Sequence, residues 1–223
     1  MRSINVFFFG DSVCFGQGIS LHKGWVPRIS ARLGELARNA GREVIVINAS
    51  VSGNTTRQAL ERMPYEVQSH NPEVLMVQFG MNDCNYWETD RGNPRVSPKA
   101  FAANLKEIVA RAKSFGAKKI FLNTNHPTGR DELPMPHTNI TYQQSNEQYN
   151  EIIRDVVTDM GRGVILNDME NLFRASAPTR EHLLRLLMPD KLHLSEAGHD
   201  LYFSTIYRRM DAVILDLLGD PSA

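Results

Sequence analysis

The chain has 223 residues, with 25 acidic and 25 basic side chains, so its formal net charge is zero. This length suits one domain with a sizeable core, and we expect residues 1–223 to form a single domain. The balanced charge argues against a nucleic-acid-binding surface and against a polybasic patch for membranes.

Short apolar segments along the chain predict the strands of a buried sheet. The first, residues 4–9, ends at Gly10 and is too short for a signal peptide or a membrane span. We therefore expect no membrane span and a cytoplasmic protein. Further strands are predicted, in chain order, over residues 43–48, 74–79, 119–123 and 164–167.

Amphipathic segments between these strands predict helices. Ser97 followed by Pro98 begins one helix, and Gly116 ends it. The last helix is expected to turn one stripe toward the core, formed by Leu201, Thr205, Met210, Val213 and Leu217. The other predicted helices are, in chain order, 25–38, 55–69, 141–160, a short one over 180–187, and this last one over 197–217.

Strands that alternate with helices predict a parallel sheet covered on both faces. We expect an α/β fold, a three-layer α/β/α sandwich with a five-stranded parallel sheet in flavodoxin-like order. In such sheets, ligands bind beyond the carboxyl ends of the strands. The site is therefore expected at that edge.

Polar residues follow the first three predicted strands. Ser12 comes directly after the first strand in Gly-Asp-Ser, Gly53 follows the second, and Asn82 follows the third in Gly-Met-Asn-Asp. Because the strands are expected to be parallel, these residues should meet at one edge of the sheet. Asp190 and His193 must return to that edge after the long segment 172–189.

Together these residues provide the groups for acyl transfer through a serine. A serine hydroxyl is a weak nucleophile that needs a base, and His193 would be that base with Asp190 orienting it. Taken alone, Gly-Asp-Ser is also an ordinary turn, and Asp190 with His193 could be surface residues before a helix that Ser195 caps.

The four blocks resemble the signature blocks of SGNH hydrolases, also called the GDSL superfamily, from the first strand to the last helix. Val13 stands where the GDSL name has leucine. The resemblance implies an oxyanion hole formed by the backbone N–H groups of Ser12 and Gly53 and the side-chain amide of Asn82. Of the four blocks, the one that contains Gly53 has the loosest boundaries.

We expect a serine esterase that removes a short acyl group, such as acetyl, from an oxygen ester of a small molecule or carbohydrate. No cofactor or metal is expected. An acyltransferase or thioesterase with the same triad is the nearest alternative, and a non-catalytic carbohydrate-binding or scaffold protein is another. The sequence leaves the oligomeric state open.

Substrate contacts are expected in the long loops 84–96 and 124–140. Tyr86 and Trp87 could stack on a sugar, line an acyl pocket or cap the core. His126 follows the fourth strand and is the other candidate for substrate contact, or for the base. Asp11 and Asp83 are expected to hold loops by accepting backbone hydrogen bonds.

Overall fold

The computed structural model describes residues 3–219. Its centre is a five-stranded parallel sheet with the order β2-β1-β3-β4-β5, which confirms the predicted flavodoxin-like arrangement. The strands are β1 (Ile4–Gly10), β2 (Val44–Asn48), β3 (Val74–Gln78), β4 (Lys119–Asn123) and β5 (Val164–Asn167).

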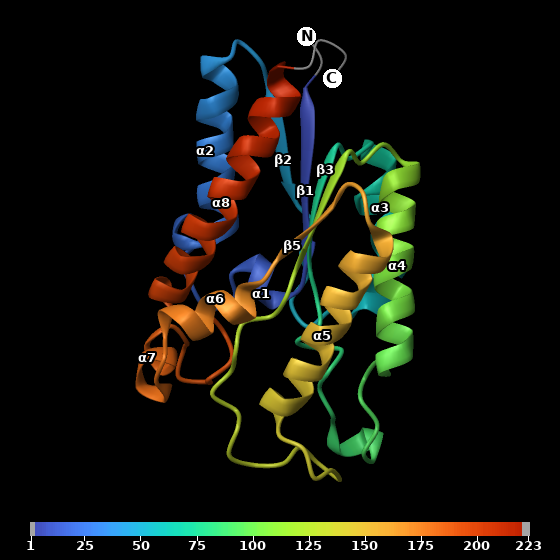
Figure 1. Ribbon diagram of the computed structural model, residues 1–223, viewed down its shortest axis with the longest axis vertical. Coiled ribbons are helices and arrows are strands. Elements are labelled where there is room, and N and C mark those ends of the chain that lie inside the picture. The colour runs from blue at the N-terminus through green and yellow to red at the C-terminus, as the bar shows by residue number, and fades with distance from the viewer. Residues whose placement is uncertain (1–2, 220–223) are drawn as a thin grey trace.

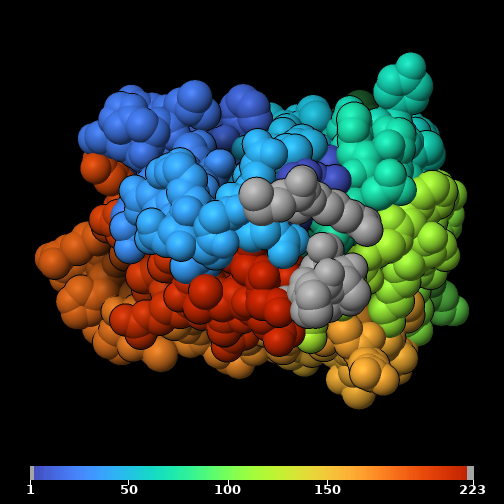
Figure 2. All heavy atoms as spheres, turned by 90° about the horizontal axis from the view of Figure 1, so that it is seen from above, coloured from blue at the N-terminus to red at the C-terminus, as the bar shows by residue number. Residues whose placement is uncertain are grey.

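Helices cover both faces of the sheet, as predicted. On one face, α2 (Trp25–Asn39) packs beside α8 (Glu196–Gly219). On the other face, α3 (Thr56–Glu66), α4 (Pro98–Ser114) and α5 (Tyr142–Met160) lie in a row (Figure 1). Viewed from above, the red atoms of α8 lie next to the blue segment that includes α2, and the yellow-green α4 lies across the molecule (Figure 2).

The position of each strand in the sheet explains its composition. In the inner strand β1, Phe7, Phe8 and Phe9 are completely buried because helices cover both faces. In the edge strand β2, Ile45 keeps 40% of its surface exposed. The strand that leads to Ser12 is therefore anchored in the core.

A row of buried amide side chains joins the carboxyl ends of three strands. Gln78 at the end of β3 donates to Asn125 and accepts from Asn123 of β4. Asn123 in turn accepts from Asn167 of β5, at 2.8 Å. Because buried polar groups must be paired, this network fixes how the strand ends lie beneath the site.

Three short helices lie at the carboxyl edge of the sheet, namely α1 (Ser12–Phe15), α6 (Met169–Ser176) and α7 (Arg180–Arg185). The predicted short helix corresponds to α7. The sequence pattern predicts no helix over residues 169–176, where the structure has α6. Asp168 caps α6 by accepting a hydrogen bond from the N–H of Asn171.

Two predicted helices differ in detail from the structure. The helix predicted over 55–69 ends at Glu66, and a 3₁₀ turn over Gln68–His70 follows it. In α8, Met210 and Leu217 are buried as predicted, whereas Leu201 and Val213 are only partly buried and lie one residue before the buried Tyr202 and Ile214. None of the helices within residues 3–219 is long and apolar enough to cross a membrane.

Candidate active site

Ser12 is the first residue of α1, directly beyond the end of β1. The helix turns back so closely over the strand that a Cβ at Gly10 would lie 2.6 Å from Cys14 Cβ and 2.8 Å from the Gln78 carbonyl oxygen. Asp11 caps the helix by accepting from the N–H of Val13 at 3.0 Å. The short segment thus holds the nearly buried Ser12 over the sheet edge.

Ser12, His193 and Asp190 form a continuous chain of hydrogen bonds. His193 Nε2 lies 2.9 Å from Ser12 Oγ, and His193 Nδ1 lies 2.5 Å from Asp190 Oδ2. With Nδ1–H donating to the carboxylate, Nε2 is left as the acceptor for the serine hydroxyl proton. This is the arrangement that a serine nucleophile needs from its base.

The turn that carries Asp190 and His193 is tied to the start of α8. A bridge joins Leu187 to Leu194, and the N–H of Met188 donates to the His193 carbonyl at 2.7 Å. Lys191, at the tip, has a left-handed backbone with φ of 60°. The return of this segment to Ser12, which the sequence alone left open, is built from α6, α7 and this turn.

The second carboxylate oxygen of Asp190 is also fully used. Oδ1 accepts from the backbone N–H groups of Leu192 and His193, each at 3.0 Å. Partial burial alone would raise the pKa of Asp190, but these bonds and the His193 bond together hold its pKa below the usual value. The carboxylate therefore stays ionised beside the imidazole.

His126, the candidate for substrate contact or for the base, is enclosed within the fold. Its ring is completely buried, with Nδ1 3.0 Å from the Tyr202 hydroxyl and Nε2 2.8 Å from the Leu192 carbonyl. Burial lowers the pKa of His126 to about 4. A neutral ring thus donates from Nε2 to the peptide next to His193 and helps to hold that turn.

The three groups expected to form an oxyanion hole all lie at the carboxyl edge, beyond β1, β2 and β3. Gly53 has φ of 81° and an open surrounding, since a Cβ there would meet nothing within 4 Å. Within residues 3–219, neither the N–H of Ser12 nor that of Gly53 donates to another protein group. Asn82 is half-buried, and its Nδ2 lies 3.4 Å from Asp11 Oδ2.

Two buried carboxyl groups lie beneath these donors. Asp83 accepts from both the N–H and the hydroxyl of Thr56, at 2.9 and 2.5 Å, and Asp11 caps α1. Both therefore hold loops, as predicted. Burial raises the pKa of Asp11 to about 7 and that of Asp83 to about 6, since a charge is poorly solvated there.

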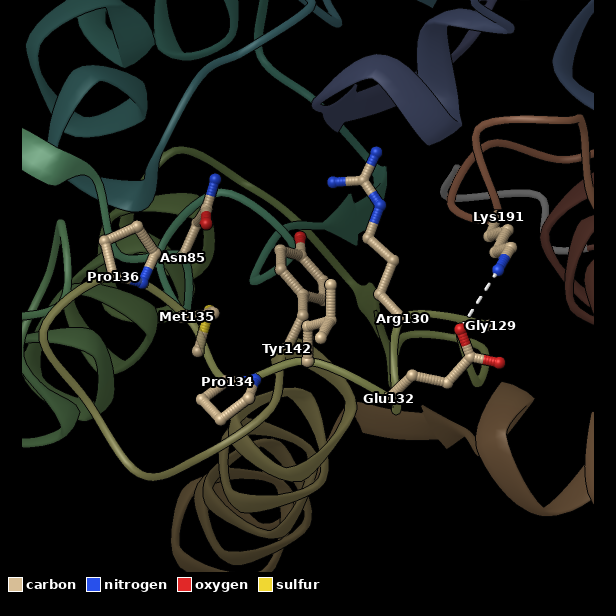
Figure 3. Close-up of a pocket in the computed structure, with 10 residues that line it drawn as sticks. Asn85, Gly129, Arg130, Glu132, Pro134, Met135, Pro136, Tyr142 and Lys191 are labelled. Atoms are coloured by element: carbon tan, nitrogen blue, oxygen red, sulfur yellow. Dashed lines mark hydrogen bonds and ion pairs between the residues drawn. The ribbon is translucent and has the colours of Figure 1, made fainter.

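A cavity of about 350 Å³ lies in the loop 124–140 and is also lined by Lys191, from the turn between Asp190 and His193. Arg130 donates from Nε to the Asp190 carbonyl at 3.0 Å, and its guanidinium stands beside the ring of Tyr142 (Figure 3). The remaining walls are largely apolar and include Leu133, Pro134, Met135 and Pro136. The sequence predicts substrate contacts in the loop 124–140, but no motif marks these lining residues individually.

The two aromatic candidates of the loop 84–96 behave differently. Tyr86 is half-buried and packs against the core. Trp87 keeps 49% of its surface exposed and lies under the guanidinium of Arg95, 4.1 Å from the ring centre. Neither of them lines the cavity beside Arg130. Among the described residues, no three His, Cys, Asp or Glu side chains group as metal ligands.

Comparison with known proteins identifies the family to which this chain belongs. A model of the GDSL-like lipase/acylhydrolase family matches residues 8–201. An arylesterase from Vibrio mimicus is 30% identical over 125 residues, which is 56% of each chain, so the match spans about half of that relative. An acetylxylan esterase from Geobacillus stearothermophilus is 23% identical over 210 residues, 87% of this chain and 88% of the relative.

Solved structures show the same fold over nearly the whole chain. The crystal structure of Axe2, an acetylxylan esterase from Geobacillus stearothermophilus, superposes with a TM-score of 0.73 and covers 97% of this chain and 94% of its own. Its sequence identity is 20%, so this similarity establishes the architecture alone.

Proposed function

The chain belongs to the GDSL-like lipase/acylhydrolase family, and from this premise we propose that it is a serine esterase for short-acyl oxygen esters. The observation that carries the proposal is the hydrogen-bond chain from Asp190 through His193 to Ser12 at the carboxyl edge of the sheet. The acetylxylan esterase and arylesterase relatives support an ester substrate.

The proposed reaction has two acyl-transfer steps. Ser12 Oγ attacks the ester carbonyl carbon while His193 Nε2 takes its proton, and His193 returns this proton to the departing alcohol. Water then attacks the acyl-enzyme, losing a proton to Nε2, and collapse frees the acid and restores Ser12. Asp190 orients and stabilises the imidazolium throughout.

Negative charge on the carbonyl oxygen would be met by the N–H groups of Ser12 and Gly53 and by the Asn82 amide. The cavity beside Arg130 and Tyr142 is much larger than an acetyl group, and Arg130 and Lys191 connect it to the turn that carries Asp190 and His193. We assign it to the alcohol part of the ester, with the acyl group held near Ser12.

The test is hydrolysis of 4-nitrophenyl acetate by Ser12→Ala, with the exposed Ser20→Ala as the matched control. We expect the rate of Ser12→Ala to fall by at least about a thousandfold, and Ser12 to be the residue that a fluorophosphonate labels. A Ser12→Ala enzyme with the wild-type rate would refute the mechanism.

Longer nitrophenyl esters, acetylated xylo-oligosaccharides and acyl thioesters would then define the substrate. A preference for acetyl over octanoyl esters is expected. Dominant acyl transfer to an added sugar, or faster cleavage of thioesters, would instead favour the acyltransferase or thioesterase with the same triad.

A further inference from the structure

Arg95 connects two of the groups assigned to the oxyanion hole. It lies at the end of the loop 84–96, half-buried, and its Nη1 donates to the Gly53 carbonyl at 3.2 Å and to Asn82 Oδ1 at 3.3 Å. One nitrogen atom thus links the loop after β2 to the loop after β3. No other side chain within residues 3–219 makes a hydrogen bond to both.

The contact with Asn82 determines which way its amide points. A guanidinium can only donate, so Asn82 must turn its oxygen toward Arg95. On the opposite side, Asp11 Oδ2 lies 3.4 Å from Nδ2 and favours the amide nitrogen there. A flipped amide would set its NH₂ group against the guanidinium and its oxygen against the carboxyl group. It would also present an oxygen, in place of a donor, to the reacting carbonyl.

The contact with Gly53 holds a turn that has little packing of its own. Gly53 is exposed, and the space around its Cα is open. The turn is otherwise held by Asn54, whose N–H donates to the Val51 carbonyl and whose side chain accepts from Arg62 at 2.7 Å. Arg95 is therefore the connection between this turn and the Asn82 loop.

Arg95 is itself held in place on several sides. The ring of Trp87 lies 4.1 Å from its guanidinium carbon, which is the geometry of a cation–π contact. Burial lowers the pKa of Arg95, and the nearby charges of Asp83 and Asp90 act in the opposite direction. A charged group that is fixed in this way can hold the Asn82 side chain and the Gly53 turn in one orientation.

We propose that Arg95 is a positioning residue that keeps the Asn82 amide and the Gly53 turn in the orientation that stabilises the oxyanion. This inference rests on the proposed esterase function. It assigns Arg95 no contact with the substrate, and it gives Trp87 a supporting position beneath Arg95.

The test replaces Arg95 by methionine, which keeps an unbranched side chain about as long as the arginine stem and removes every donor. We expect kcat for 4-nitrophenyl acetate to fall about tenfold to a hundredfold, with KM changed by less than about threefold, since a ground-state contact is not lost. Arg95→Lys, which retains a donor, should recover part of kcat. Arg91→Met in the same loop is the matched control and should behave as wild type.

A double-mutant cycle with Asn82→Ala separates positioning from general support of the fold. If Arg95 acts mainly through Asn82, Arg95→Met should lower kcat by a much smaller factor in the Asn82→Ala background than in wild type. An equal loss of kcat in both backgrounds, or a change confined to KM, would overturn the inference. If Arg95→Met does not fold, the cycle is run with Arg95→Lys.

The inference and the proposed function fail in different ways. Wild-type activity in Ser12→Ala would refute the esterase mechanism whatever Arg95 does. An inactive Ser12→Ala together with an Arg95→Met enzyme of unchanged kcat would leave the esterase proposal intact and refute the role of Arg95 alone.

Discussion

At the scale of single residues, Asp190 is the most heavily bonded group of the candidate triad. One oxygen contacts His193 Nδ1, and the other accepts two backbone N–H groups of the same turn. The carboxylate therefore has two tasks, because it orients the imidazole and closes the turn that presents it. The two tasks can be separated by replacing Asp190 with asparagine, because its amide oxygen can still accept the backbone hydrogen bonds.

We expect Asp190→Asn to remain folded and to lose about a hundredfold to ten-thousandfold in kcat. The amide oxygen can still accept the backbone bonds, but the NH₂ group faces Nδ1 and favours the tautomer with the proton on Nε2. That proton blocks the transfer from Ser12. The measurement is kcat for 4-nitrophenyl acetate, together with the melting temperature.

The matched control is Asp131→Asn, an exposed carboxylate of the loop 124–140 that pairs with Arg180. It should keep the wild-type kcat. An Asp190→Asn enzyme as active as this control would show that His193 does not depend on Asp190.

At the scale of elements, the start of α8 determines where His193 lies. Gly198, in the first turn of α8, packs against the backbone of Leu186, and a Cβ there would overlap the Leu186 carbonyl oxygen. That same oxygen accepts the N–H of Ser195, two residues after His193. A larger side chain at position 198 must therefore displace the turn that carries the triad.

We predict that Gly198→Ala lowers the free energy of unfolding by roughly 1–3 kcal/mol, the usual cost of overpacking, and lowers kcat/KM at temperatures where the protein is folded. Urea denaturation and initial rates would measure the two effects. Gly219→Ala, at the other end of α8, is the control, because a Cβ there meets nothing within 4 Å. Equal stability and activity of the two variants would contradict this account.

The elements that were predictable are those whose sequence pattern coincides with their burial. Strand β1 and helix α4 follow from apolar runs and from a Ser-Pro start that the structure retains, with Ser97 accepting from the N–H of Ala100. Helix α6 was missed because it directly follows β5 and is only eight residues long. Its capping residue, Asp168, was the available signal.

At the scale of the whole molecule, the topology explains why the blocks could be found and why their surroundings could not. Parallel strands bring Ser12, Gly53 and Asn82 to one edge whatever the loops do. The burial of His126, the contacts of Arg95 and the cavity beside Arg130 depend on how long loops fold over that edge. No periodicity in the sequence encodes those contacts.

Buried titratable groups also make the stability of the folded protein depend on pH in two opposing ways. Burial raises the pKa of Asp11 and Asp83 from 3.8 to about 7 and 6, so the folded state binds more protons than the unfolded state, and stability falls as pH rises through this range. Burial lowers the pKa of His126 and His199 from 6.5 to about 4, so between these values stability rises with pH.

Because the two effects overlap, we expect the free energy of unfolding of the wild-type protein to change little between about pH 4 and pH 6.5. Asp11→Asn keeps the oxygen that caps α1 but removes the titration of this carboxyl group from the pH dependence of stability. Its stability relative to wild type should therefore increase from pH 4 to pH 7.5, by up to about 4 kcal/mol. Urea denaturation across this range measures the difference. Asp216→Asn, at an exposed position of α8, is the control, and its free energy of unfolding should differ from that of wild type by a constant amount. A constant difference for Asp11→Asn would mean that Asp11 is ionised in the folded protein at pH 4.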